Sequence, residues 1–570
     1  MPILLFATVF LFKTIYFEII FGNLSNTSGK ITWLIFKHDT FIMGIILLFY
    51  YFSSITKGVV RVFSRVLPLV LIILYTIDMV LFLKFTTRIF LEDIIRYSYD
   101  IIIFMGSLER FFTFGTILFM IIVFPLGVIF LFYTFTYDSN IKKRRYLLIA
   151  IVLILFNSIL HDSLKSYNWI YQNIVELNYR QGLNISYSKK IKKYYKNMDY
   201  SKINNITCKD KEYSKKKNII LLVVESYSMY HSKYFSGLRD YTPHIDKIAK
   251  ENISFTNFYA NSFKTEGGLI ALLMGINPFP VVKQYYIKGK GFRSTLHFKE
   301  NSLPNRLKAL GYETEFLTTG NLEFADKDYW LDEIGFDYKE GAEHPYYNNW
   351  KRFKFNAAED KALFNRVKAR MKLQKKPYFI AIENVSTHYP FINPKTGKMS
   401  EEGAFRYFDN EFKIFYKYLV DNNFFDNGIL IVVPDHRATT LINKGEDDLY
   451  KDRAPSIIPT FVIDGKTKEV ITDRYQQTDI PNSIINLLSN KVCTSDFSGD
   501  IFKKITPKYI YHTRYDNKSI VNLFTQSRDY RIKLNGDKTS FNLDYSTNTD
   551  FPKDEKRIID KINYERIIRK

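Results

Sequence analysis

The pattern of apolar and polar positions divides the chain near residue 165. Before this point the sequence consists of long apolar runs, and after it polar and apolar positions mix as in a globular protein. A helix needs about 20 mostly apolar residues to span a bilayer. Five runs approach this length and predict an α-helical membrane domain over residues 1–165 with about five transmembrane helices: Ile3–Phe21, Phe41–Ser54, Val66–Leu83, Phe114–Phe135 and Tyr146–Leu160.

Basic residues between these runs predict the orientation. Lys57, Arg61 and Arg65 follow the second run, and a second basic cluster at 142–145 follows the fourth. Both clusters fall on the same side of a five-span model, and Lys/Arg-rich loops face the cytoplasm. We therefore expect a multi-pass protein of the inner or plasma membrane, with the chain after residue 165 on the extracytoplasmic (periplasmic or outer) face.

The remainder predicts a polar linker over 166–216 and an α/β catalytic domain over 217–505. Apolar runs at 218–224, 378–383 and 428–433 are typical of buried parallel strands. Strands that alternate with helices indicate a mainly parallel sheet. The predicted helices are Pro243–Glu251, Leu303–Leu310, Ala358–Leu373 and Phe405–Asp421.

Residues 506–570 alternate in a different way, which predicts antiparallel strands and a charged helix that complete the catalytic domain. The linker is rich in Lys and Tyr, for example at 189–197. It fits either a solvated connector or a basic strip lying on lipid headgroups.

Charge and cysteine content narrow the class of protein. The chain has 80 Lys and Arg against 58 Asp and Glu, a net charge of +22. Such an excess fits nucleic acid or an anionic membrane, and the apolar first part favours the membrane, so we expect no nucleic acid partner. Cys208 and Cys493 are the only cysteines, which excludes a disulfide-rich scaffold and a Cys-rich metal site. An extracytoplasmic location would permit a disulfide between them, although we do not expect one.

Candidate chemistry lies at the ends of the predicted strands, where sites of parallel sheets are found. Glu225 ends the first strand, Asp435 and His436 follow another, and Thr265 precedes an apolar helix. Two carboxylates, an imidazole and a hydroxyl suit one divalent metal ion, Zn²⁺ or Mn²⁺, with Mg²⁺ as a further option. Taken singly, each acid also fits a helix cap or an ion pair. A metal on the Thr265 oxygen would make it a nucleophile.

Several fragments occur in an order that resembles the alkaline phosphatase/sulfatase superfamily, specifically its lipoteichoic acid synthase-like, phosphoglycerol transferase membrane branch. They are NIILLVVES (218–226), TPHIDKIA (242–249), FTNFYAN (255–261), Lys264-Thr265, STHYPF (386–391), VVPDHR (432–437) and TDIPNSIINLL (478–488). The resemblance implies that the metal ligands are Glu225, Thr265, Asp435 and His436, with Thr265 as the nucleophile. It also implies that glycerol phosphate passes from phosphatidylglycerol, a membrane phospholipid donor, through phosphothreonine to an extracytoplasmic glycan or polymer of the cell envelope.

Three further residues are candidates for binding substrate. His388 matches a substrate-binding histidine of the family, Lys264 adjoins the nucleophile, and Asn321 lies in a segment that resembles a substrate-binding one. In that segment Thr319 replaces a histidine of the lipoteichoic acid synthases, which leaves the headgroup open. Four further histidines of polar segments are expected at the surface: His231, His244, His297 and His344. Of these, His231 and His244 leave room for a second metal.

Three other functions are alternatives to phosphoglycerol transfer. Sulfatase activity is disfavoured because the family's sulfatases need Cys or Ser in a Cys/Ser-x-Pro-x-Arg context, whereas this chain has Thr265-Glu-Gly-Gly-Leu. A phosphoethanolamine transferase shares the threonine and the metal but more often carries several disulfides. A non-catalytic lipid sensor would be expected to have lost ligands that are present here.

Overall fold

The computed structural model separates the chain into two compact units, Met1–Leu183 and Asn184–Lys570, and each is described by itself. The residues that it describes are 10–11, 13, 28–85, 88–90, 143–159, 171–181, 187–212, 216–280, 290–353, 356–514, 519–541 and 552–569.

The first unit is helical. Its described helices are α2 (Ser28–Ile55), α3 (Gly58–Phe85), α7 (Lys143–Ile159) and α9 (Ile174–Gln181). Within α2 and α3, the stretches Thr32–Ile55 and Gly58–Met79 are long and apolar enough to cross a membrane.

The five predicted spans are thus matched in part. The second and third lie within α2 and α3, and α7 covers most of the fifth but has only 17 residues. The first and fourth, over 3–21 and 114–135, fall almost entirely outside the described residues. Length and composition therefore support two spans in the described residues, and the five-span arrangement is not confirmed.

Charged side chains inside the first unit are paired. Lys13 lies 2.9 Å from Asp39 on α2, and Arg88 lies 2.6 Å from Asp78 on α3. Each of these four residues is at least nine-tenths buried. Pairing offsets the high cost of removing a charge from water, which explains how such residues fit within an apolar helical unit.

The second unit is built on an eight-stranded sheet with the order β5-β4-β6-β2-β7-β8-β3-β9. Only β8 runs antiparallel to its neighbours, so the predicted α/β domain with a mainly parallel sheet is confirmed. The strands are β2 (Asn218–Val224), β3 (Ile253–Tyr259), β4 (Glu313–Thr318), β5 (Tyr338–Glu340), β6 (Tyr378–Glu383), β7 (Gly428–Pro434), β8 (Thr460–Ile463) and β9 (Glu469–Gln476).

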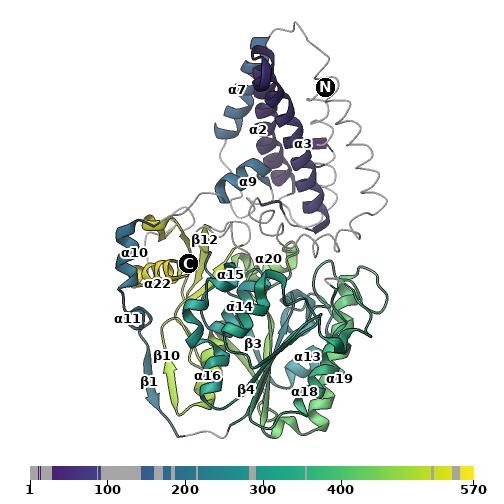
Figure 1. The fold of residues 1–570 in the computed structure, drawn as a ribbon, viewed down its shortest axis with the longest axis vertical. Coiled ribbons are helices and arrows are strands. Elements are labelled where there is room, and N and C mark those ends of the chain that lie inside the picture. Colours follow the sequence, from purple (N-terminus) through teal and green to yellow (C-terminus); the bar gives the residue numbers. More distant parts are fainter. Residues whose placement is uncertain are drawn as a thin grey trace. The chain divides into compact units, whose positions relative to one another are not determined.

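Helices cover both faces of this sheet (Figure 1). In β2, Ile219, Leu221 and Val223 pack on one face, whereas the intervening residues pack on the other, as the alternation of side chains along a strand requires. The first face carries α14 (Thr265–Met274), α16 (Leu303–Ala309), α17 (Lys327–Glu333) and α21 (Asp479–Leu488). The second carries α13 (Pro243–Lys250), α18 (Asp360–Met371) and α19 (Glu401–Asp421). Shorter helices are α12 (Lys233–Ser236), α15 (Lys290–Arg293) and α20 (Lys444–Tyr450).

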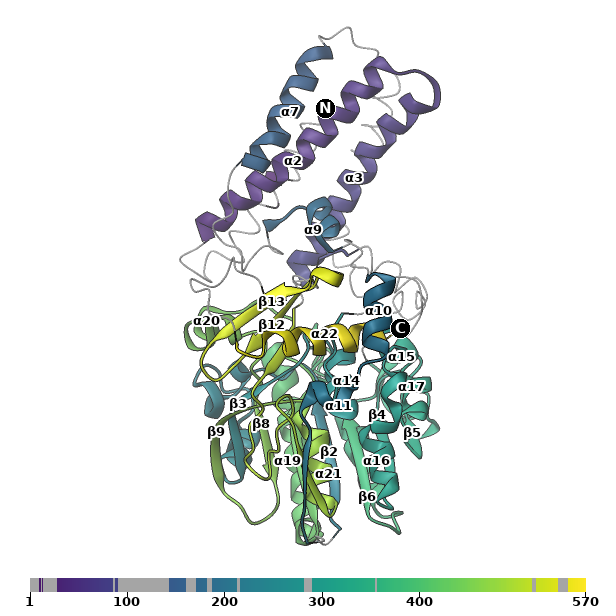
Figure 2. The same ribbon diagram turned by 90° about the vertical axis from the view of Figure 1, so that its left-hand side faces the viewer.

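The C-terminal part forms a separate antiparallel sheet with the order β11-β12-β13-β14, followed by α22 (Glu555–Ile568) (Figure 2). This confirms the strands and the helix that the sequence predicts after residue 506. The strands are β11 (Ile510–Thr513), β12 (Ile520–Phe524), β13 (Asp529–Lys533) and β14 (Ser540–Phe541).

The segment predicted as a linker is more structured than a solvated connector. It contributes α10 (Lys189–Lys196), α11 (Tyr200–Asn204) and β1 (Thr207–Asp210) to the second unit. Both helices contact α22. At α10, apolar residues recur every fourth position, and Tyr195 and the preceding Tyr187 are buried against Ile567.

Strand β1 pairs with β10 (Lys491–Thr494), and a disulfide joins Cys208 to Cys493 across this pair. The expectation of two free thiols was therefore wrong. The two cysteines are 285 residues apart in the chain. They face each other because β1, which lies in the predicted linker, pairs with β10.

Candidate active site

Adjacent parallel strands bring the candidate metal ligands together. β2 and β7 pair in register, so that Val224 lies opposite Pro434. The next residues, Glu225 after β2 and Asp435 after β7, therefore leave the same edge of the sheet side by side. Thr265 is the first residue of α14, at the end of the helix where free backbone N–H groups favour an anion.

The four predicted ligands converge. The Thr265 hydroxyl lies 3.2 Å from Glu225 Oε2 and 3.4 Å from His436 Nε2. The same His436 nitrogen lies 3.2 Å from Asp435 Oδ2 and 3.7 Å from Glu225 Oε1. Glu225, Asp435 and His436 are buried, and each offers one ligand atom within 4.8 Å of the others.

The chemistry of these atoms fits a cation. His436 Nδ1 lies 2.7 Å from the carbonyl oxygen of Arg437, so this nitrogen must carry the proton and donate it. The lone pair of Nε2 then faces the carboxylates of Glu225 and Asp435. Asp435 Oδ2 is buried and accepts no hydrogen bond among the described residues. Three acceptors that face one another suit a divalent metal ion, because a buried acceptor without a partner is costly.

The pKa values of these groups also favour a cation at this site. Burial, followed by the charge of Asp435, raises the pKa of Glu225 to about 8. Burial also raises the pKa of Asp435 to about 6 and lowers the pKa of His436 below its ordinary value. The two carboxylates therefore ionise together only at a cost, and a cation at this point would offset it.

A set of hydrogen bonds fixes the backbone around Glu225 and Asp435. Glu225 N–H donates to Asn384 Oδ1 (2.8 Å), and Thr387 Oγ1 donates to the Glu225 carbonyl (2.7 Å). On the other side, Gln477 Nε2 donates to the Asp435 carbonyl (2.7 Å). Loops from four strand ends are thereby held together, which is what orients the two carboxylates.

Helix α14 approaches this loop closely because of Gly268. A Cβ atom at this position would lie 2.2 Å from the carbonyl oxygen of Asp435. A backbone atom cannot yield as a flexible side chain does, so only glycine permits this contact. The close approach places the N-terminus of α14, and with it Thr265, beside Asp435.

His231 was predicted at the surface, and this was wrong. It is fully buried because the ring of Phe405 stacks on it, with the ring centres 3.7 Å apart. Ser228 N–H donates to His231 Nδ1 (3.0 Å), and Nε2 lies 3.1 Å from Glu401. Ser228 Oγ in turn accepts a hydrogen bond from Ala438 N–H (2.8 Å), so the histidine supports the segment that follows His436.

The three predicted substrate-binding residues each make local contacts. His388 is half-buried, with Nδ1 2.6 Å from the Tyr389 carbonyl, and it directly follows Thr387. Lys264 precedes Thr265 and pairs with Glu266 at 2.5 Å. Asn321 Oδ1 accepts from Glu323 N–H at 2.7 Å. Their roles towards substrate stay predictions.

Sequence reasoning missed two buried features of this edge of the sheet. Lys327 on α17 forms an ion pair of 2.5 Å with Glu383, the last residue of β6. Thr319 Oγ1, after β4, is buried and has no hydrogen-bond partner among the described residues. The carboxylate that ends β6 was a visible signal, but nothing in the sequence connects it to a lysine 56 residues earlier.

Comparison with known proteins agrees with the fold and the motifs. Residues 217–490, just under half of the chain, match the model of the sulfatase family. A solved protein from Vibrio parahaemolyticus, described as a protein in the alkaline phosphatase superfamily, is similar in fold, with a TM-score of 0.52 and 20% sequence identity. The similarity covers 67% of this chain and 93% of that protein.

Curated relatives confirm the resemblance to the lipoteichoic acid synthase-like branch. The chain is 24% identical over 368 residues to lipoteichoic acid synthase 1 of Bacillus subtilis (strain 168), covering 56% of each protein. It is 22% identical over 346 residues to lipoteichoic acid synthase 2 of the same organism, covering 53% of this chain and 52% of the relative. The chain thus spans about half the length of the curated relatives that it matches.

Proposed function

We propose that this chain is an integral membrane, metal-dependent phosphotransferase whose catalytic domain lies outside the cytoplasm. The observation that carries the proposal is the convergence of Glu225, Thr265, Asp435 and His436 at one edge of a sulfatase-family sheet. A hydroxyl at a helix N-terminus, next to three acceptors that suit a cation, is the arrangement that phosphoryl transfer through a covalent intermediate requires.

One divalent ion, Zn²⁺ or Mn²⁺, would be held by Glu225, Asp435, His436 and the Thr265 oxygen. When bound, such an ion lowers the pKa of the threonine hydroxyl and polarises the phosphoryl group. Nitrogen and oxygen ligands of this kind and number suit Zn²⁺ and also Mn²⁺.

The chain's own residues would carry out the transfer in two steps. Thr265 Oγ attacks the phosphorus of the donor lipid, forms a phosphothreonine and releases diacylglycerol. The threonine proton leaves towards Glu225 Oε2, which already accepts its hydrogen bond, and it reaches the departing oxygen of diacylglycerol. A hydroxyl of the acceptor then attacks the phosphothreonine, gives up its proton and restores Thr265.

The donor that we propose is phosphatidylglycerol, and the acceptor is an extracytoplasmic glycan or growing polymer. The names of the two Bacillus relatives, lipoteichoic acid synthases 1 and 2, support this choice. His388 is proposed to bind the phosphate or headgroup, because its loop is tied to the backbone of Glu225 through Thr387. Lys264 and Asn321 are proposed to bind the headgroup as well.

Mass spectrometry of the purified full chain after incubation with phosphatidylglycerol tests the proposal. We expect an adduct with the mass of glycerol phosphate on the peptide that contains Thr265. Thr265→Ala should lose both the adduct and turnover, whereas Thr396→Ala, at an exposed turn, should keep both. Turnover by Thr265→Ala, or an adduct on another residue, would overturn the assignment of the nucleophile. A phosphoethanolamine adduct would overturn only the donor.

A further inference from the structure

Helix α10 carries an exposed basic face directly after the membrane unit. Its eight residues, KKIKKYYK, include five lysines and no acid. All five lysines are exposed, and within the part of the chain that the structure describes none of them forms an ion pair. The helix begins eight residues after the end of α9, the last described helix of the first unit.

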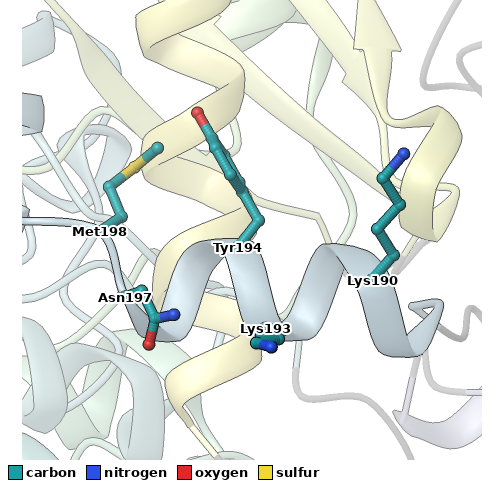
Figure 3. Close-up of a pocket in the computed structure, with 5 residues that line it drawn as sticks. All are labelled: Lys190, Lys193, Tyr194, Asn197 and Met198. Atoms are coloured by element: carbon teal, nitrogen blue, oxygen red, sulfur yellow. The ribbon is translucent and has the colours of Figure 1, made fainter.

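The two sides of α10 differ in chemistry. Ile191, Tyr195 and Met198 face α22, where Tyr195 is buried. The exposed side carries an open depression of about 470 Å³ lined by Lys190, Lys193, Tyr194 and Asn197, and by Met198 where this side meets the packed one (Figure 3). These positions have the spacing i, i+3, i+4, i+7 and i+8 of one helical stripe. Ammonium groups beside a half-exposed tyrosine and a thioether suit a surface that is anionic outside and apolar beneath.

We propose that this basic face, the five lysines of α10 with Tyr194, docks on the anionic phospholipid headgroups of the membrane that anchors the chain. The inference rests on the proposed function, which places the second unit beside that membrane. Lysines near the end of a membrane unit are attracted to anionic lipid, and the attraction extends over about one Debye length, about 8 Å at physiological salt.

The fixed position of α10 gives this contact a consequence for catalysis. Tyr187 OH and Tyr195 OH donate to Asn563 and Asp560 of α22, each at 2.7 Å. Just beyond α22, Arg569 donates to the carbonyls of Asn277 and Phe279, each at 3.0 Å. Those two residues lie three and five positions after the end of α14, the helix that begins with Thr265. Docking of α10 therefore holds the catalytic unit as a body at the surface that supplies the donor lipid.

Lysine acylation of the full chain tests the proposal without any substitution. The protein is reconstituted in vesicles of phosphatidylcholine, with or without phosphatidylglycerol, and labelled with a membrane-impermeant acylating reagent. Peptide mass spectrometry then gives a labelling rate for each lysine. With phosphatidylglycerol we expect labelling of the α10 lysines to slow roughly threefold or more. Lys372 and Lys375, exposed after α18, serve as controls and should label equally in both vesicles.

Two further arms make the result specific. Salt at about 1 M reduces the Debye length to about 3 Å and should restore labelling. Thr265→Ala should give the same protection as the unaltered chain, so a failure of the proposed catalysis would leave this result standing. Equal labelling of α10 in both vesicles would overturn the proposal. So would equal protection in phosphatidylcholine vesicles by soluble poly(glycerol phosphate), since the occupant would then be an anionic polymer.

Discussion

Single backbone contacts place the proton on opposite ring nitrogens of His436 and His231, two of the buried histidines. In His436, Nδ1–H donates a hydrogen bond to the carbonyl of Arg437, so Nε2 keeps a lone pair that can bind a cation. In His231 the N–H of Ser228 donates to Nδ1, so the proton sits on Nε2 and can be donated to Glu401. The same side chain therefore serves as a candidate ligand in one place and as a structural donor in the other.

Glu401 gives a pH-dependent prediction. Burial raises the pKa of this carboxyl, but hydrogen bonds from His231 and Tyr230 and the charge of Arg239 outweigh it and lower the pKa to about 2. A depressed pKa stabilises the folded state above the unfolded value, near 4.3, and the stabilisation is lost as pH falls towards 2. Glu401→Gln should therefore lower the free energy of unfolding by about 2–3 kcal/mol at neutral pH.

Urea unfolding of the full chain at several pH values checks this. The difference between the variant and the unaltered chain should shrink as pH falls below about 4. Glu402→Gln is the matched control, because its partner Arg406 is 44% exposed and exposed pairs contribute under about 1 kcal/mol. A difference that stays constant with pH would show that the ionised carboxylate of Glu401 is not the stabilising species.

His388 separates substrate binding from metal binding. If it hydrogen-bonds the donor phosphate or headgroup, His388→Ala should keep the metal and lower kcat/KM by about 10- to 150-fold, the cost of losing one bond to a charged group. Elemental analysis and steady-state kinetics on the same preparation measure both quantities, with His297→Ala, an exposed residue, as control. Loss of metal would make His388 a ligand, and unchanged kcat/KM would remove it from the substrate site.

At this scale the sequence predicted the residues that stand at strand ends and missed those that support them. Glu225, Asp435 and His436 each follow a buried strand, and parallel strands bring such ends together. The partners Asn384 and Gln477 could not be predicted, because their hydrogen bonds to Glu225 and Asp435 depend on how whole loops fold. His231 was misplaced for the same reason, since Phe405, which covers it, is far away in the chain.

Among the secondary-structure elements, an unbroken apolar run was the reliable sequence signal of a buried strand. β2, β6 and β7 are unbroken apolar runs and were predicted within a residue or two. β3 was not predicted as a strand, because its sequence ISFTNFY mixes polar and apolar residues and its pairing switches register. Helix α10 within the predicted linker was not predicted, because its lysines obscure the Ile and Tyr spacing by which it packs on α22.

The β1–β10 pair predicts a redox-dependent stability. The Cys208–Cys493 disulfide closes a loop of 285 residues, and a cross-link of this kind stabilises a protein by about 2–4 kcal/mol. Reductant should therefore lower the thermal unfolding midpoint of the second unit. The double variant Cys208→Ser and Cys493→Ser should show the lower midpoint from the start and no response to reductant. A response in the double variant would assign the effect of reductant to something other than this bond.

In the whole molecule, the apolar stretches and the candidate metal centre lie in different units. Among the described residues, the first unit contains two stretches long and apolar enough to cross a membrane, and the second contains residues 217–490, which match the sulfatase family model. Residues 143–145 of the second basic cluster begin α7, whereas the disulfide and the candidate metal centre lie in the second unit. Disulfides persist mainly outside the cytoplasm, which supports the orientation predicted from the basic clusters.

Cysteine labelling in intact cells tests this orientation. Ser540→Cys, exposed in β14, should react with a membrane-impermeant maleimide, whereas Lys143→Cys, at the start of α7, should react only after the membrane is opened. The unaltered chain is the control, because both native cysteines are in the disulfide and should stay unlabelled. Labelling of Lys143→Cys from outside would contradict the cytoplasmic placement of its basic cluster. It would also place an odd number of spans before α7, instead of the four that bring both basic clusters to the same side.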